Sequence, residues 1–171
     1  MQQKFPIYLS QDRIFSNSQK AASLENKTKL GELKDGKVIY SEFEALYLIE
    51  KKFSEATSLK NNKKLSENEL IQLFSKKQKD FHTKYIIFKY LKNKGYIVKT
   101  GLKFGEEFRV YKKSEKHAKW IVFPVKSSEK ISPKDLISKS RVTHSTGKKL
   151  LLGIVDSEED ITFYEIDWVK P

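Results

Sequence analysis

Cysteine is absent from this 171-residue chain. Disulfides, cysteine-ligated zinc sites and thiol nucleophiles are therefore excluded, so any chemistry must come from oxygen and nitrogen groups. Long apolar runs are also absent. No stretch approaches the roughly 20 residues of a membrane-spanning helix, and residues 1–6 lack the apolar segment of a signal peptide. We expect a cytoplasmic protein without a membrane partner.

Arginine is scarce. The chain has only Arg13, Arg109 and Arg141, and lysine supplies the other 31 of its 34 basic residues. Arginine recognises phosphate or guanine through two parallel hydrogen bonds, whereas lysine acts as a compact point charge. Lysine is therefore expected to provide general attraction, and each arginine is a candidate for a specific contact.

The net charge is +12 and the pI is about 9.6, which points to a polyanionic partner. RNA and DNA are the candidates, and an anionic membrane surface is the least favoured because long apolar runs are absent. Residues 1–80 hold 15 basic and 11 acidic residues, a net charge of +4. Residues 81–171 hold 19 basic and 11 acidic residues, a net charge of +8. We expect the polyanion to contact the C-terminal half.

The first half of the chain indicates short strands followed by helices. Residues 4–9, 13–15 and 38–40 are typical of strands. Two capping boxes, Ser41 to Glu44 and Ser66 to Glu69, each open a helix. The polar stretches 16–29 and 54–64 are interpreted as loops.

The second half changes character. A helix is predicted from about residue 80 to Gly95, then strands over 96–99, 103–111 and 119–125, a helix opened by Ser132-Pro133, and strands over 150–155 and 161–169. We predict an α+β protein: a small α/β N-terminal domain over 1–78, and a C-terminal catalytic domain over 79–171 with a mainly β sheet flanked by two helices.

Three side chains in the C-terminal half could cleave RNA without a metal ion. Attack by the RNA's own 2′-hydroxyl needs a base for the 2′-proton, an acid for the departing 5′-oxygen and a cation for the phosphate. Histidine suits the acid and lysine suits the phosphate, which makes His117 and Lys148 candidates. A phenol such as Tyr111 needs neighbouring cations to act as the base, and Lys112 and Lys113 follow it.

Taken singly, each candidate also has an ordinary structural interpretation. Alternation along residues 104–111 places Tyr111 with Arg109 on the face opposite Phe108 and Val110, as for any exposed strand tyrosine. His117 could be a solvated loop histidine, and Lys148 is one of 31 lysines.

The segments around these residues resemble the archaeal tRNA-splicing endonucleases, from about residue 85 to 171. The resemblance rests on Gly95-Tyr-Ile-Val-Lys-Thr-Gly-Leu-Lys-Phe-Gly105 with Phe108-Arg-Val-Tyr111, on His117 before Ala118-Lys-Trp-Ile-Val122, and on Arg141-Val-Thr-His-Ser-Thr-Gly-Lys-Lys-Leu-Leu-Leu152. It implies that Tyr111 is the general base, His117 the general acid and Lys148 the electrostatic partner of the transition state.

The resemblance further implies a metal-independent endonuclease without cofactors. Such an enzyme excises introns from precursor tRNA at bulge-helix-bulge junctions and leaves 2′,3′-cyclic phosphate and 5′-hydroxyl ends. The expected assembly is a homotetramer, or a heterotetramer with a structural paralogue. Arg141 matches one of two arginines that clamp a flipped bulge base in the family, and no clear second arginine follows.

Two other functional classes stay open at this point. One is a non-catalytic RNA-binding or structural subunit of the same type of complex, which would have no need of all three candidate side chains. The other is a DNA-binding module of the restriction-endonuclease type, which would need a metal-binding acid cluster beside a lysine. No such cluster stands at a strand pair in this sequence.

The acidic stretch Asp156, Glu158, Glu159 and Asp160 also has two interpretations. It is typical of a solvated hairpin turn, and it lacks the ligand spacing of a calcium loop. The resemblance implies instead that it docks into a basic pocket of a neighbouring subunit. His82 and His144 lack a second histidine at metal-ligand spacing, so no metal site is assigned.

Overall fold

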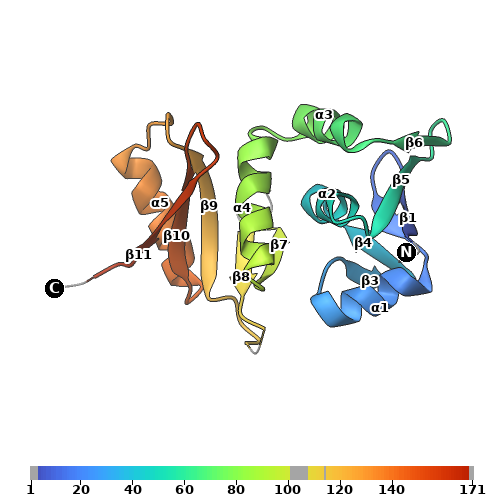
Figure 1. Ribbon diagram of the computed structural model, residues 1–171. Coiled ribbons are helices and arrows are strands. Elements are labelled where there is room, and N and C mark those ends of the chain that lie inside the picture. Colours follow the sequence, from blue (N-terminus) through green and yellow to red (C-terminus); the bar gives the residue numbers. More distant parts are fainter. Residues whose placement is uncertain (1–3, 101–107, 114, 170–171) are drawn as a thin grey trace. The chain divides into compact units, whose positions relative to one another are not determined.

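A computed structural model describes residues 4–100, 108–113 and 115–169. The chain forms two compact units, Met1–Phe81 and His82–Pro171, which divide within the first turn of helix α4 (Phe81–Asn93). Figure 1 shows strands and helices in both units, which confirms the predicted α+β class.

The first unit is built on a six-stranded sheet in the order β3-β4-β2-β1-β5-β6. Its strands are β1 (Phe5–Leu9), β2 (Ile14–Ser16), β3 (Glu32–Lys34), β4 (Lys37–Tyr40), β5 (Ser54–Ser58) and β6 (Lys63–Leu65), and its helices are α1 (Gln19–Thr28), α2 (Glu42–Glu50) and α3 (Glu67–Lys77). Strand β1 pairs antiparallel with β2 and parallel with β5, so it lies inside the sheet.

Helix α2 supplies much of the core of this unit. It begins at the predicted capping box, in which the Ser41 hydroxyl accepts from the Glu44 amide and the Glu44 carboxylate accepts from the Ser41 amide. Phe43 of this helix stacks on Phe81 with ring centroids 5.0 Å apart, and Phe74 of α3 packs against the same ring at 5.5 Å. These three phenylalanines are almost completely buried, so the two capped helices are held by apolar packing.

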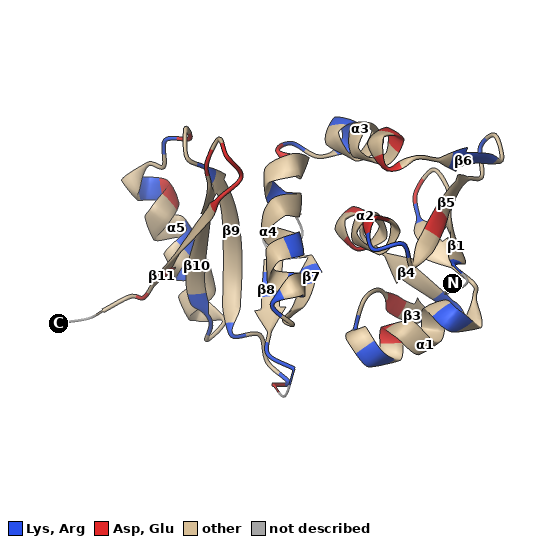
Figure 2. Cartoon of the chain, in the orientation of Figure 1, with Lys and Arg blue, Asp and Glu red and all other residues tan. Residues whose placement is uncertain are grey.

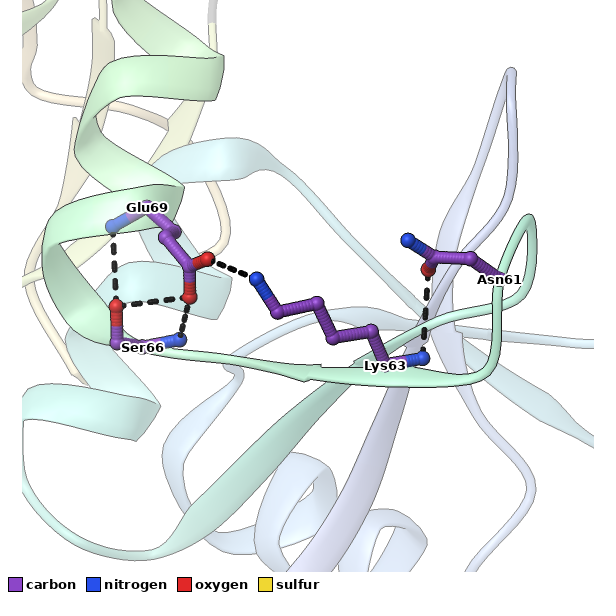
Figure 3. Close-up of polar contacts among 4 residues, drawn as sticks. All are labelled: Asn61, Lys63, Ser66 and Glu69. Carbon is purple, nitrogen blue, oxygen red and sulfur yellow. Dashed lines mark hydrogen bonds and ion pairs between the residues drawn. The ribbon is translucent and has the colours of Figure 1, made fainter.

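The connection from β6 to α3 is fixed by a compact set of polar contacts (Figure 3). Glu69 Oε2 accepts from the amide of Ser66 at 2.9 Å and from its hydroxyl at 3.0 Å, while Ser66 Oγ accepts from the Glu69 amide at 3.3 Å. Lys63 Nζ donates to Glu69 Oε1 at 2.6 Å. The bonds from Lys63 and Ser66 lower the pKa of Glu69 from 4.5 to about 2. The second predicted capping box is therefore confirmed.

Two predicted loops in this unit are wrong. The polar stretch 16–29 contains helix α1, which is capped by Ser18 and whose one fully buried residue is Ala21. The polar stretch 54–64 contains strands β5 and β6. Strand β5 has little apolar character of its own, and its backbone is ordered by pairing along the whole of β1. Tertiary pairing overrides a weak local pattern in both segments.

The second unit is built on a five-stranded sheet in the order β11-β10-β9-β8-β7. Its strands are β7 (Ile97–Thr100), β8 (Phe108–Tyr111), β9 (Trp120–Lys126), β10 (Lys149–Val155) and β11 (Ile161–Ile166), and helix α5 (Pro133–Ser145) joins β9 to β10. The predicted strand over 103–111 is observed from Phe108, because residues 103–107 lie outside the described part of the chain. Strands β9 and β10 are parallel, and the other neighbours are antiparallel.

Two helices cover opposite faces of this sheet (Figure 1), as predicted. Helix α5 packs on the face that carries the buried cluster of Ile121, Phe123, Val125, Leu150 and Leu152. Helix α4 covers the other face, where the Phe88 ring lies 5.8 Å from that of Phe108. A Cβ at Gly153 would lie 2.7 Å from Ile87 Cδ1, so glycine allows the close approach of α4 to β10. Among the described residues, no helix is long and apolar enough to cross a membrane.

Candidate active site

Three neighbouring strands place the candidate catalytic residues at one end of the second sheet. Strand β8 ends at Tyr111, while β9 and β10 begin at Trp120 and Lys149. The register pairs Trp120 with Val110 on one side and with Lys149 on the other. His117 and Lys148 precede the starts of β9 and β10 by three residues and one residue. The topology therefore brings the strand ends that carry or adjoin all three candidate residues to the same end of the sheet, where β8 stops and β9 and β10 start.

Tyr111 is half-buried on the face of β8 that carries Arg109. Phe108 and Val110 point to the other face and are buried, so the predicted alternation along β8 is confirmed. Within the described part of the chain, the Tyr111 hydroxyl has no hydrogen-bond partner.

His117 is exposed in the loop that joins β8 to β9. The next residue, Ala118, is buried, and the Lys119 amide donates to the carbonyl of Val110 at 2.8 Å. The loop is thus anchored directly after the histidine. Lys112 and Glu115, which form an ion pair at 3.4 Å, lie at its start. The backbone that follows His117 is therefore fixed at this end of the sheet, and the His117 side chain is open to solvent.

Lys148 is half-buried and lies three residues after the last residue of α5, Ser145. The helix ends with Gly147 in the left-handed region at φ 64°, a conformation that glycine adopts without strain. The amides of Gly147 and Lys148 donate to the carbonyls of His144 and Thr143, both at 2.9 Å. The Lys148 ammonium donates to the Thr146 carbonyl at 2.9 Å and is paired with no carboxylate among the described residues.

The adjacent Lys149 has a different environment. Its Nζ lies 2.7 Å from Glu165 Oε1 and 3.6 Å from Asp167 Oδ2. The hydrogen bond and charge of Glu165 raise the pKa of Lys149 above its usual value, and the Lys149 and Trp120 hydrogen bonds lower the pKa of Glu165. Two consecutive lysines are thereby distinguished: Lys149 is engaged by two carboxylates, whereas Lys148 contacts a backbone carbonyl and no carboxylate of the described residues.

Arg141 is exposed in the last turns of α5, close to the end of the helix that leads to Lys148. His144 lies one turn further along the same helix side. The His144 ring packs edge-on against the indole of Trp168, with centroids 4.6 Å apart. Trp168 is 58% exposed, which is unusual for so large an apolar ring. The sequence pattern predicted Trp168 within a strand over 161–169, whereas β11 ends at Ile166. The contact of its ring with His144 was not predicted.

The acidic stretch lies at the other end of the same sheet. It joins the C-terminal end of β10 to β11, whereas the candidate catalytic residues lie at the start of β10 (Figure 2). The Asp156 carboxylate accepts from the amides of Glu158 and Asp160 at 2.8 and 3.0 Å, so it orders the turn. Glu159 Oε1 contacts His82 Nε2 of α4 at 2.7 Å. Within the part of the chain that the structure describes, the Glu158 and Asp160 carboxylates have no partner.

The described residues contain no group of three or more His, Cys, Asp or Glu side chains placed to hold a metal ion. Strand pairing and helix α5 place Tyr111, His117, Lys148 and Arg141 at one end of the sheet. The acidic loop lies at the other end.

Comparison with known proteins defines the class of this second unit. Residues 81–163 match the model of the tRNA intron endonuclease catalytic C-terminal domain. Similarity to relatives extends over the whole chain. It is 39% identical over 171 residues to the tRNA-splicing endonuclease of Pyrococcus abyssi, covering 99% of both chains. It is 41% identical over 166 residues to that of Thermococcus kodakarensis, covering 96% of this chain and 98% of the relative.

A third relative, the tRNA-splicing endonuclease of Methanothermobacter thermautotrophicus, is 35% identical over 155 residues, covering 88% of this chain and 89% of the relative. The chain belongs to the tRNA-splicing endonuclease family. The resemblance indicated by the sequence is confirmed.

Proposed function

We propose that this protein is a metal-independent endonuclease that excises introns from precursor tRNA at bulge-helix-bulge junctions. The observation that carries the proposal is the meeting of the β8 end with the starts of β9 and β10, which gathers Tyr111, His117 and Lys148 at one edge. The names of the relatives support tRNA as the substrate class. The net charge of +12 suits an RNA substrate.

In the proposed reaction, Tyr111 accepts the proton of the 2′-hydroxyl next to the scissile phosphate. The 2′-oxygen attacks phosphorus, and the bond from phosphorus to the 5′-oxygen breaks. His117 donates a proton to that departing oxygen, so one fragment ends in a 2′,3′-cyclic phosphate and the other in a 5′-hydroxyl. Lys148 stabilises the charge that develops on the phosphate oxygens.

Arg141 and Trp168 are proposed to hold an unstacked bulge base. Both lie on the side of α5 that carries His144, and they offer a guanidinium plane and an aromatic ring. Unpaired bases are recognised by stacking on such groups. This assignment supplies a second candidate beside Arg141 for base clamping, where the sequence offered no second arginine.

The proposed assembly is a tetramer, either of this chain alone or with a structural paralogue. A substrate with two scissile junctions suits an enzyme with paired active sites. Size-exclusion chromatography with light scattering on the chain expressed alone, with a cleavage assay on each peak, distinguishes the two assemblies. Tight RNA binding without cleavage in every peak, both alone and with a structural paralogue added, would favour the non-catalytic subunit.

The nucleophile provides the decisive test of the mechanism. A precursor tRNA with hydrogen in place of the 2′-hydroxyl at one junction is expected to stay uncut there, while the other junction is still cut. Cleavage is expected to persist in excess EDTA, provided that the RNA stays folded. A nuclease that uses metal-activated water would behave in the opposite way, because its nucleophile does not depend on the 2′ position. Cleavage of the deoxy junction at an undiminished rate would refute the mechanism.

A further inference from the structure

One carboxylate in the second unit connects three strands. Glu165 in β11 accepts from the indole Nε1 of Trp120 in β9 at 2.6 Å and from Nζ of Lys149 in β10 at 2.7 Å. Its two oxygens are used separately, Oε2 for the indole and Oε1 for the ammonium. Because β10 lies between β9 and β11, the contact spans the width of all three strands.

The residues joined by Glu165 are the first residues of their strands. Trp120 begins β9, Lys149 begins β10, and the parallel register pairs them directly. The backbone pairing extends to the residue before β9, because the Lys149 amide donates to the Lys119 carbonyl at 3.1 Å. His117 lies three residues before Trp120, and Lys148 lies directly before Lys149. The carboxylate therefore binds the side chains of two strand-starting residues, one of which follows His117 by three positions and the other follows Lys148 by one.

Neighbouring groups fix the same cluster from other directions. The Lys119 ammonium lies 4.1 Å from the centroid of the Trp120 ring, and Tyr96 packs edge-on against that ring at 5.5 Å. Asp167 provides a second carboxylate for Lys149 at 3.6 Å. The indole therefore has contacts at its N–H and on its ring, which restricts its rotation. Such a restrained side chain can transmit the position of one strand to the next.

We propose that Glu165 is a positioning residue for cleavage, acting through Trp120 and Lys149 on the loops that carry His117 and Lys148. The inference rests on the proposed function. By holding the starts of β9 and β10 together, the carboxylate sets the distance between the proposed acid and the proposed phosphate-binding cation. Its engagement of Lys149 also leaves Lys148 as the member of this lysine pair that no described carboxylate holds.

Loss of this contact is expected to affect catalysis more than folding. The side chains of Glu165 and Lys149 are 37% and 46% exposed, and ion pairs with that exposure add little to global stability. Displacement of a catalytic group by about 1 Å can cost about 100-fold in rate. If Glu165 only supported the fold, its loss would lower the stability of the protein more than the cleavage rate.

The test compares Glu165→Ala and Glu165→Gln with a matched control, Glu55→Ala. Glu55 in the first unit also bridges two basic groups, Lys64 at 2.7 Å and Lys4 at 3.7 Å, and is 44% exposed. Single-turnover cleavage by Glu165→Ala is expected to fall about 10- to 100-fold. RNA affinity is expected to stay within a few-fold. Glu165→Gln, whose amide oxygen can still accept from Trp120, is expected to lose less, and Glu55→Ala is expected to cleave as the wild type does.

Hydrogen exchange provides a readout that is independent of cleavage. The amides of Lys119 and Lys149 are expected to exchange faster in Glu165→Ala, while those in the middle of β9 and β10 keep their protection. An active wild type with an equally active Glu165→Ala variant would overturn the positioning role alone. The positioning role would also be overturned if Glu165→Ala and Glu55→Ala lost the same amount of thermal stability and the same factor in cleavage rate. A wild-type tetramer, of this chain alone or with a structural paralogue, that fails to cut the precursor would instead refute the proposed function.

Discussion

The imidazole of His144 packs edge-on against the indole of Trp168, with an interplanar angle of 87°. The contact joins the last turn of α5 to the segment after β11. It places an exposed aromatic ring on the helix side that carries Arg141, where a base could be stacked. The proposed base-binding role of Trp168 beside Arg141 rests on this contact.

Trp168→Ala is expected to lower single-turnover cleavage by about 10- to 100-fold, because stacking of a base on an aromatic ring contributes about 1–3 kcal/mol. Trp168→Phe should retain most of the rate, since a ring remains. The control is a precursor that lacks the bulge base at the same position. On that substrate, Trp168→Ala should cut at the same rate as the wild type. A rate loss as large as that on the normal precursor would contradict the stacking role.

Lys148→Ala and Lys149→Ala are expected to differ strongly. Removing the Lys148 ammonium should cost about 2.7–4 kcal/mol of transition-state stabilisation, or about 10²- to 10³-fold in rate, as for other groups that bind developing negative charge. Lys149 is engaged by Glu165 and Asp167, and Glu165 keeps its bond to Trp120 without it. A much smaller loss is therefore expected for Lys149→Ala. Single-turnover cleavage rates of the two variants measure the difference. A larger loss for Lys149→Ala than for Lys148→Ala would assign the stabilisation of the transition state to Lys149.

His117→Ala is expected to abolish cleavage while precursor affinity stays within a few-fold. The imidazole is proposed to serve the leaving group, whereas most affinity comes from phosphate contacts. Lys116→Ala is the matched control, because it removes an exposed neighbour in the same loop. It should weaken the salt dependence of binding slightly and leave the cleavage rate unchanged. A His117→Ala variant that cuts at near the wild-type rate would remove the histidine from the mechanism.

The acidic loop can be tested for subunit docking without disturbing its own turn. Asp156 orders the turn and Glu159 contacts His82, so both are left in place. Neutralising the other two acids in Glu158→Gln/Asp160→Asn should shift the assembly from tetramers toward dimers and lower activity, if the loop docks into a basic pocket. Light scattering at several concentrations measures the shift. An intact, active tetramer would favour the solvated turn.

Acid is expected to weaken the cap of α3 in a defined pH window. The folded-state pKa of Glu69 is about 2, below its ordinary value of 4.5. Its stabilising contribution is therefore fully present above pH 4.5 and is lost as the pH falls through about 2. A carboxyl NMR titration should give this midpoint. In Lys63→Met, which removes the 2.6 Å bond, the midpoint should rise toward the ordinary value.

Local patterns determined much of the secondary structure. The capping boxes at Ser41 and Ser66 fixed the starts of α2 and α3, and Ser132-Pro133 fixed the start of α5. Alternation along β8 correctly separated buried Phe108 and Val110 from half-buried Tyr111. These signals are readable because hydrogen bonds within one turn, or side-chain directions along one strand, need no distant partner.

Tertiary structure decided the rest. Strand β5 is ordered by β1, from which it is distant in sequence, and helix α1 forms from a stretch with little apolar pattern. The sequence by itself determined the family, the fold class and the candidate residues Tyr111, His117 and Lys148. The antiparallel pairing of β8 with β9 and the parallel pairing of β9 with β10 brought their strand ends to one end of the sheet. Only the fold placed Glu165 beside Lys149 and Trp168 beside His144. Such contacts depend on strand order and register, which no local pattern encodes.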